Sequence, residues 1–118
     1  MGHSLGARVV YYTLRSLAGG PVQRIKAAHL LGGAVGTGSK REWDEAASAV
    51  YGGVHNYYSK RDDVLRILYS AGRLLIGTPA IGRNPIRADA PNLVNHDVTK
   101  WVGSHGEFKE ASAAYLVP

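Results

Sequence analysis

The chain has 118 residues, a formal net charge of +5 and no cysteine. Its length fits one domain covering residues 1–118, and the missing cysteine excludes disulfides and cysteine-ligated metals. No apolar run reaches the roughly 18 residues of a membrane span, and no secretory leader is recognisable, so we expect a cytoplasmic chain without a transmembrane segment. The 14 lysine and arginine residues are scattered, which predicts no nucleic-acid partner.

The first half of the chain predicts two helices and one strand. Apolar side chains recur at helical spacing over residues 5–18, and the glycines and proline of residues 19–21 end that helix. Residues 25–31 read as a short buried strand. After a glycine-rich loop, Ser39 can cap a helix over residues 40–51, with a glutamate three residues further on as in a capping box.

The second half predicts two more strands and two more helices. The strands cover residues 54–59 and 93–98, and the helices cover residues 62–76 and 107–115. Residues 77–91 contain three prolines and predict an irregular segment. Because strands separated by helices favour right-handed βαβ units, the predicted fold class is α/β, with about three parallel strands and flanking helices.

The first residues form a G-x-S-x-G box, which in serine hydrolases is the nucleophile elbow. Such a turn holds the serine, here Ser4, in a strained conformation clear of the backbone. Only very small side chains fit beside it, which would explain Gly2 and Gly6. The backbone N–H of Leu5 would supply half of an oxyanion hole. The alternative is a glycine-rich turn that contains a serine by chance.

Candidate partners for Ser4 follow the later strands. Asp62 and Asp63 come after residues 54–59, and His105 comes shortly after residues 93–98. Catalytic groups gather where parallel strands end. We therefore expect Asp62 to be the acid, with Asp63 as its competitor, and His105 to be the base, since imidazole exchanges protons near neutral pH. The alternatives are a plain helix cap for the aspartate and a surface loop for the histidine.

The other histidines favour structural roles. His29, His55 and His96 fall inside predicted strands and are expected to be hydrogen-bonded interior groups, with His96 the weaker candidate for the base. His3 is expected to shape the turn. The spacing of the histidines suggests no metal site, and no cofactor is expected.

Several stretches of the chain together resemble the α/β-hydrolase superfamily, and most closely its poorly characterised branch related to transmembrane and coiled-coil domain proteins. They are residues 2–9, 56–65, 77–82, 95–99 and 104–106. The resemblance covers the carboxyl-terminal half of the family's domain. It implies an esterase or lipase that hydrolyses carboxylic or lipid esters through a Ser4–His105–Asp62 triad and an acyl-enzyme.

The resemblance also implies that parts of the site come from elsewhere. The family's earlier strands and its second oxyanion donor have no counterpart in the residues quoted above. The sheet would then have an open inner edge, which favours pairing with another chain. The expected partner is a second copy or a complementary N-terminal chain. The alternative function is a non-catalytic hydrolase half that acts as an interaction module.

Overall fold

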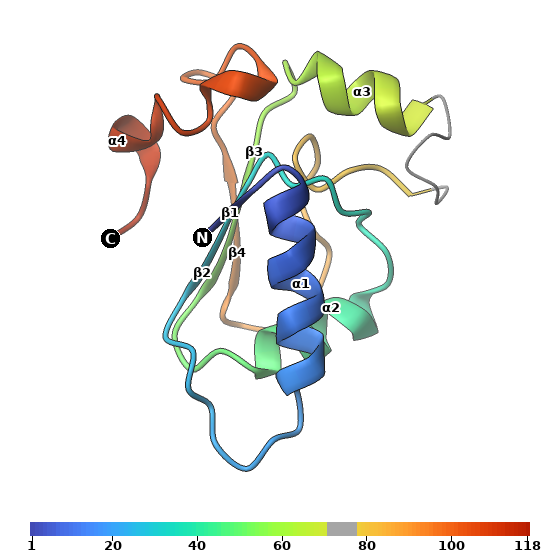
Figure 1. The fold of residues 1–118 in the computed structure, drawn as a ribbon, viewed down its shortest axis with the longest axis vertical. Coiled ribbons are helices and arrows are strands. Elements are labelled where there is room, and N and C mark those ends of the chain that lie inside the picture. The colour runs from blue at the N-terminus through green and yellow to red at the C-terminus, as the bar shows by residue number, and fades with distance from the viewer. Residues whose placement is uncertain (71–77) are drawn as a thin grey trace.

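A parallel four-stranded sheet organises the chain in the computed structural model, which describes residues 1–70 and 78–118. Its strands, in both spatial and chain order, are β1 (Gly2–His3), β2 (Ala28–Leu31), β3 (Val54–Tyr58) and β4 (Leu93–Asp97) (Figure 1). The α/β class is therefore confirmed. The sheet has one strand more than the three that the sequence located, because Gly2 and His3 pair with Leu30 and Leu31. A two-residue strand has no hydrophobic alternation to reveal it.

The helices are short and lie mainly on one side of the sheet and beyond its carboxyl edge. They are α1 (Leu5–Leu17), α2 (Lys40–Ser48), α3 (Asp63–Ser70), the 3₁₀ turn η1 (His105–Glu107) and α4 (Ser112–Tyr115). Figure 1 shows α1 and α2 on the same face of the sheet, with α3 and η1 near the ends of the strands. This arrangement leaves the carboxyl ends of the strands facing α3 and η1.

The core has two main parts, one on each face of the sheet. Under α1 and α2, the buried side chains of Leu14, Leu30 and Trp43 belong to one cluster. On α1 these inward positions recur at helical spacing, as the sequence predicted. On the opposite face, Tyr57 and Phe108 belong to a second cluster that ties the carboxyl-terminal segment to the sheet.

Two predicted elements are three residues shorter than expected. Regular pairing of β2 begins at Ala28, and Ile25 makes only an isolated bridge to Val50. That bridge draws Val50 out of the predicted helix, and α2 ends at Ser48. At the start of α2, Ser39 Oγ accepts a hydrogen bond from the backbone N–H of Glu42, which confirms the predicted cap.

The prediction of one helix over residues 107–115 is wrong. The chain instead forms η1, a series of turns and then the four-residue α4. Glu107 turns its carboxylate back to Gly103 and Ser104, while Phe108 is drawn into the core. The hydrogen bonds of Glu107 within the loop and the burial of Phe108 together outweigh the helical preference of this segment. Of the predicted helix 62–76, α3 accounts for residues 63–70, and residues 71–77 lie outside the described residues.

Candidate active site

The turn of residues 2–6 joins β1 to α1 and gives Ser4 an unusual backbone. Its φ and ψ are 56° and −120°, and within residues 1–70 and 78–118 it is the only non-glycine residue with positive φ. The surroundings fix this conformation: the N–H of Ser4 donates to the carbonyl of Leu31 at 3.0 Å, and its carbonyl accepts from Ala34 at 3.0 Å. Strain of this kind persists only where neighbouring structure enforces it.

The two glycines of this turn are not equivalent. A Cβ on Gly2 would lie 2.6 Å from the carbonyl oxygen of Gly6, so the expectation of a close approach holds there. A Cβ on Gly6 would meet no described atom within 4 Å, so the expectation that Gly6 also needs to be small is wrong. The steric requirement concerns Gly2, whose α-carbon faces the backbone of the first turn of α1.

The three sequence-predicted side chains lie in one chain of contacts. The Nε2 atom of His105 is 2.8 Å from Ser4 Oγ, and its Nδ1 atom is 2.5 Å from Asp62 Oδ2. A carboxylate can only accept, so Nδ1 carries the proton and Nε2 accepts from the serine hydroxyl. The Asp62 side chain is inaccessible to solvent, and that of His105 is 16% exposed. This arrangement can draw the proton from the serine towards the imidazole.

The two candidate acids are clearly separated by the structure. Asp62 contacts His105, whereas Asp63 is exposed and pairs with Arg66 at 3.2 Å. Asp62 Oδ1 also accepts from the backbone N–H of Leu65 at 3.0 Å, so the helix-cap interpretation holds as well. One carboxylate caps α3 with one oxygen and contacts the imidazole with the other. The cap fixes where the second oxygen points.

The loop that carries His105 has two anchors that sequence reasoning missed. Glu107 accepts hydrogen bonds from the N–H of Gly103 at 3.0 Å and from the Ser104 hydroxyl at 3.1 Å. These bonds lower the pKa of Glu107, and the bond from Gly103 has the larger effect. A Ser-x-x-Glu spacing is a capping-box signal and could have revealed this contact. The second anchor is His3, whose Nε2 lies 3.0 Å from the backbone carbonyl of His105.

The predicted oxyanion donor is the backbone N–H of Leu5. As the first residue of α1, it has a backbone N–H that no carbonyl within the helix can accept. Leu5 is 57% exposed. The positive end of the helix dipole lies at the same place, which favours negative charge beside Ser4.

The histidines within the strands lie on the face of the sheet opposite α1. His29 Nδ1 is 3.0 Å from the Tyr57 hydroxyl, and His55 Nδ1 is 2.9 Å from His96 Nε2. The rings of His29 and His55 stack 5.0 Å apart, and those of His55 and His96 lie 5.2 Å apart. They are hydrogen-bonded, as predicted, but half-buried rather than interior. His96 contacts His55 rather than Ser4.

The row of strand histidines, His29, His55 and His96, should make the fold sensitive to acid. Burial lowers the pKa of His29, His55 and His96, and mutual repulsion lowers those of His29 and His96 further. The unfolded chain therefore takes up protons first as the pH falls through about 6.5, and stability is lost on the acid side. Thermal unfolding from pH 7.5 to 5 should show a falling Tm, with a smaller fall in His55→Phe. An equal fall in both proteins would contradict this account.

Within residues 1–70 and 78–118, no group of three histidine, aspartate or glutamate side chains is arranged to hold a metal ion. No helix in the same part of the chain is both long and apolar enough to cross a bilayer.

The fold and the site geometry thus define an α/β protein with a four-stranded parallel sheet. In this protein a serine, a histidine and an aspartate side chain are in contact. The chain belongs to the family described as "Protein of unknown function (DUF726)", whose sequence model matches residues 1–117.

Longer proteins contain relatives of this chain. It is 34% identical, over 98% of its length, to the transmembrane and coiled-coil domain-containing protein STS1 of Oryza sativa subsp. japonica, covering 17% of that protein. It is 37% identical, over 98% of its length, to the uncharacterized membrane protein C6F6.13c of Schizosaccharomyces pombe, covering 15%. A Caenorhabditis elegans membrane protein, F35D11.3, is 33% identical over 93% of the chain, which covers 18% of it.

The chain therefore spans less than a fifth of these relatives. The expected relation to transmembrane and coiled-coil domain proteins is confirmed by the rice protein. No solved structure matches the chain.

Proposed function

We propose that this chain is the carboxyl-terminal half of an α/β-hydrolase domain and that it cleaves carboxylic or lipid esters through Ser4. The observation that carries the proposal is the unbroken contact from Asp62 through His105 to the Ser4 hydroxyl, made on a turn that holds the serine in a strained conformation. In this interpretation the turn of residues 2–6 is a nucleophile elbow.

The contacts support a two-step reaction. Ser4 Oγ attacks the ester carbonyl carbon while His105 Nε2 takes its proton. The negative charge on the carbonyl oxygen is stabilised by the N–H of Leu5. When the tetrahedral intermediate collapses, the ester C–O bond breaks, the alcohol leaves with the proton from His105, and Ser4 is acylated. Water, deprotonated by His105, then attacks the acyl group, and the carboxylic acid leaves as the proton returns to Ser4. Asp62 orients the imidazole throughout.

We further propose that another chain completes the site, either a second copy or a complementary N-terminal chain. β1 pairs with β2 only at Leu30 and Leu31, so the outer edge of β2 has no strand beside Ala28 and His29 in the described residues. The side chains of Met1 and Val9 are about two-thirds exposed nearby, and they line a cavity of about 230 Å³ between α1 and the start of β2. A partner on this edge would cover it and bring a second oxyanion donor.

Hydrolysis of p-nitrophenyl butyrate tests the proposal. We expect wild-type activity to disappear in Ser4→Ala and to persist in Ser16→Ala, which removes an exposed hydroxyl from α1 instead. If a second copy completes the site, the rate per chain should also rise with protein concentration. Equal hydrolysis by wild type and Ser4→Ala would contradict a serine mechanism.

The second candidate is a non-catalytic interaction module. The open edge of β2 and the exposed apolar side chains of Met1 and Val9 favour it, because they suit association whether or not Ser4 reacts. A stable complex without any hydrolysis that depends on Ser4 would favour this function over the first.

A further inference from the structure

Two neighbouring residues of one turn both contact His105. Ser4 bonds to the Nε2 atom of its ring, and His3 approaches its backbone carbonyl at 3.0 Å. Because a carbonyl can only accept, His3 donates from Nε2. We propose that His3 is a positioning residue that anchors the His105 loop to the turn of residues 2–6 and so sets the distance between Ser4 and His105. This inference rests on the proposed hydrolase function.

The His105 loop, residues 103–107, needs such an anchor because most of it is exposed to solvent. Ser104 and Gly106, on either side of His105, are exposed, and the hydrogen bonds that Glu107 accepts come from Gly103 and Ser104 of the same loop. The bond from His3 is different because it crosses 102 positions of sequence to the β1–α1 turn. That turn is itself fixed by the hydrogen bond from the Ser4 N–H to the carbonyl of Leu31. The backbone and the ring of His105 are thus both hydrogen-bonded to the turn of residues 2–6.

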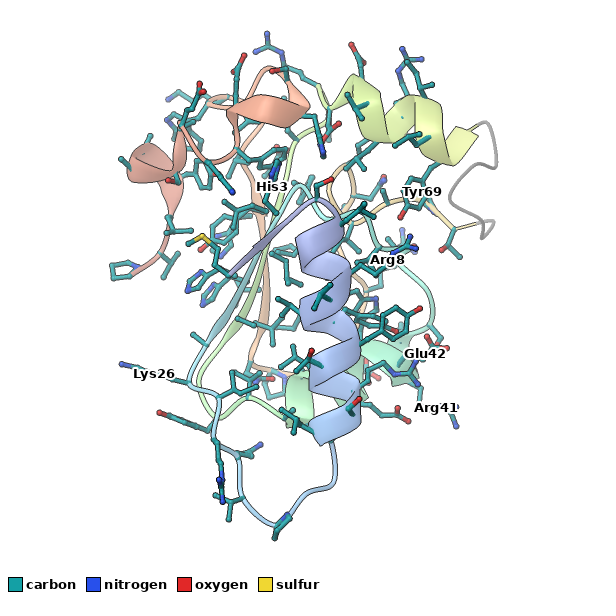
Figure 2. All side chains as sticks on the ribbon, viewed as in Figure 1. His3, Arg8, Lys26, Arg41, Glu42 and Tyr69 are labelled. Atoms are coloured by element: carbon teal, nitrogen blue, oxygen red, sulfur yellow. The ribbon has the colours of Figure 1, made fainter. Side chains whose placement is uncertain are left out.

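Packing holds the His3 side chain in the orientation that this bond requires. Its ring centroid lies 5.0 Å from that of His105 and 5.8 Å from that of Phe108, which is fully buried. Figure 2 shows His3 near the end of the sheet, close to the carboxyl-terminal segment that includes η1. Between a fixed aromatic ring and the imidazole of the base, the side chain has little rotational freedom.

Electrostatics keep His3 suited to this role during turnover. Burial lowers its pKa, and the nearby His105 lowers it further, although the bond to the His105 carbonyl opposes the shift. His3 is therefore neutral at neutral pH. When His105 takes the serine proton, its positive charge faces a neutral ring instead of a second cation.

Two substitutions separate the hydrogen bond from the packing. His3→Gln keeps an N–H donor at a similar reach, whereas His3→Phe keeps a ring and loses the donor. For p-nitrophenyl butyrate we expect His3→Phe to lower kcat by about 10- to 100-fold with KM within about twofold, because a displaced base costs rate more than binding. His3→Gln should recover kcat to within about fivefold of wild type. His96→Phe makes the same change on β4, at the opposite edge of the sheet from β1, and should leave kcat unchanged.

Hydrogen–deuterium exchange of residues 103–107 gives a readout that does not depend on catalysis. We expect faster exchange in His3→Phe and wild-type exchange in His3→Gln. The inference is overturned if His3→Phe matches wild type in exchange and in kcat, or if both variants lose activity equally. If wild type shows no hydrolysis that depends on Ser4, the proposed function fails instead, and the exchange comparison alone decides whether His3 anchors the loop.

Discussion

Asp62→Asn should lower kcat for ester hydrolysis by about 10³- to 10⁴-fold while leaving the protein folded. The amide oxygen can still accept the N–H of Leu65 and cap α3. The amide nitrogen, however, would donate to His105 Nδ1 where the carboxylate now accepts. The imidazole proton would then move to Nε2, which could no longer take the proton of Ser4. Steady-state kinetics and thermal unfolding measure the two effects separately.

The neighbouring aspartate provides a matched control. Asp63→Asn removes one charge from the same helix start, but Asp63 is exposed and pairs with Arg66 rather than with His105. An exposed ion pair of this kind contributes about 0–1 kcal/mol, so both kcat and Tm should stay close to wild type. If Asp63→Asn lowered kcat as much as Asp62→Asn, the acid would be wrongly assigned.

Gly2→Ala should destabilise the fold more than any other single methyl group added to this turn. The new Cβ would lie 2.6 Å from the carbonyl oxygen of Gly6 and 2.8 Å from the backbone nitrogen of Ala7. Backbone atoms of a packed helix cannot yield as a flexible side chain does. We expect the free energy of unfolding to fall by about 2–3 kcal/mol, as for overpacked cores, and ester hydrolysis to fall with it as Ser4 shifts.

Urea denaturation at neutral pH measures this loss, and Gly6→Ala is the control. The same methyl group at Gly6 would meet no described atom within 4 Å, and alanine favours a helix over glycine. Stability should therefore be unchanged or slightly raised. Equal destabilisation by the two substitutions would show that the close approach at Gly2 is not what the turn depends on.

The general position of the site could be predicted because the rules involved are local or topological. A glycine-serine turn before apolar residues at helical spacing indicated the start of α1. Residues that follow parallel strands meet at one edge, and this placed Asp62 and His105 near each other from their order in the chain. Neither rule needs knowledge of a particular tertiary contact.

The features that sequence reasoning missed depend on contacts between distant segments. β1 is too short to show a pattern and exists only because Leu30 and Leu31 lie beside it. The helix predicted for residues 107–115 gave way because Phe108 is drawn into the core. The strand histidines, His29, His55 and His96, are half-buried because of the elements that cover their face of the sheet. The alternation of side chains along a strand does not reveal which elements these are.

Covalent capture by a fluorophosphonate tests the role of Ser4 most directly. Intact mass spectrometry after incubation of the folded chain, at concentrations on both sides of any self-association, should show one phosphonyl group added. Peptide mapping should place it on Ser4, and the addition should vanish in Ser4→Ala and slow sharply in His105→Ala. Absence of labelling in every assembled state, or labelling that persists in Ser4→Ala, would contradict the proposal that Ser4 is an activated nucleophile.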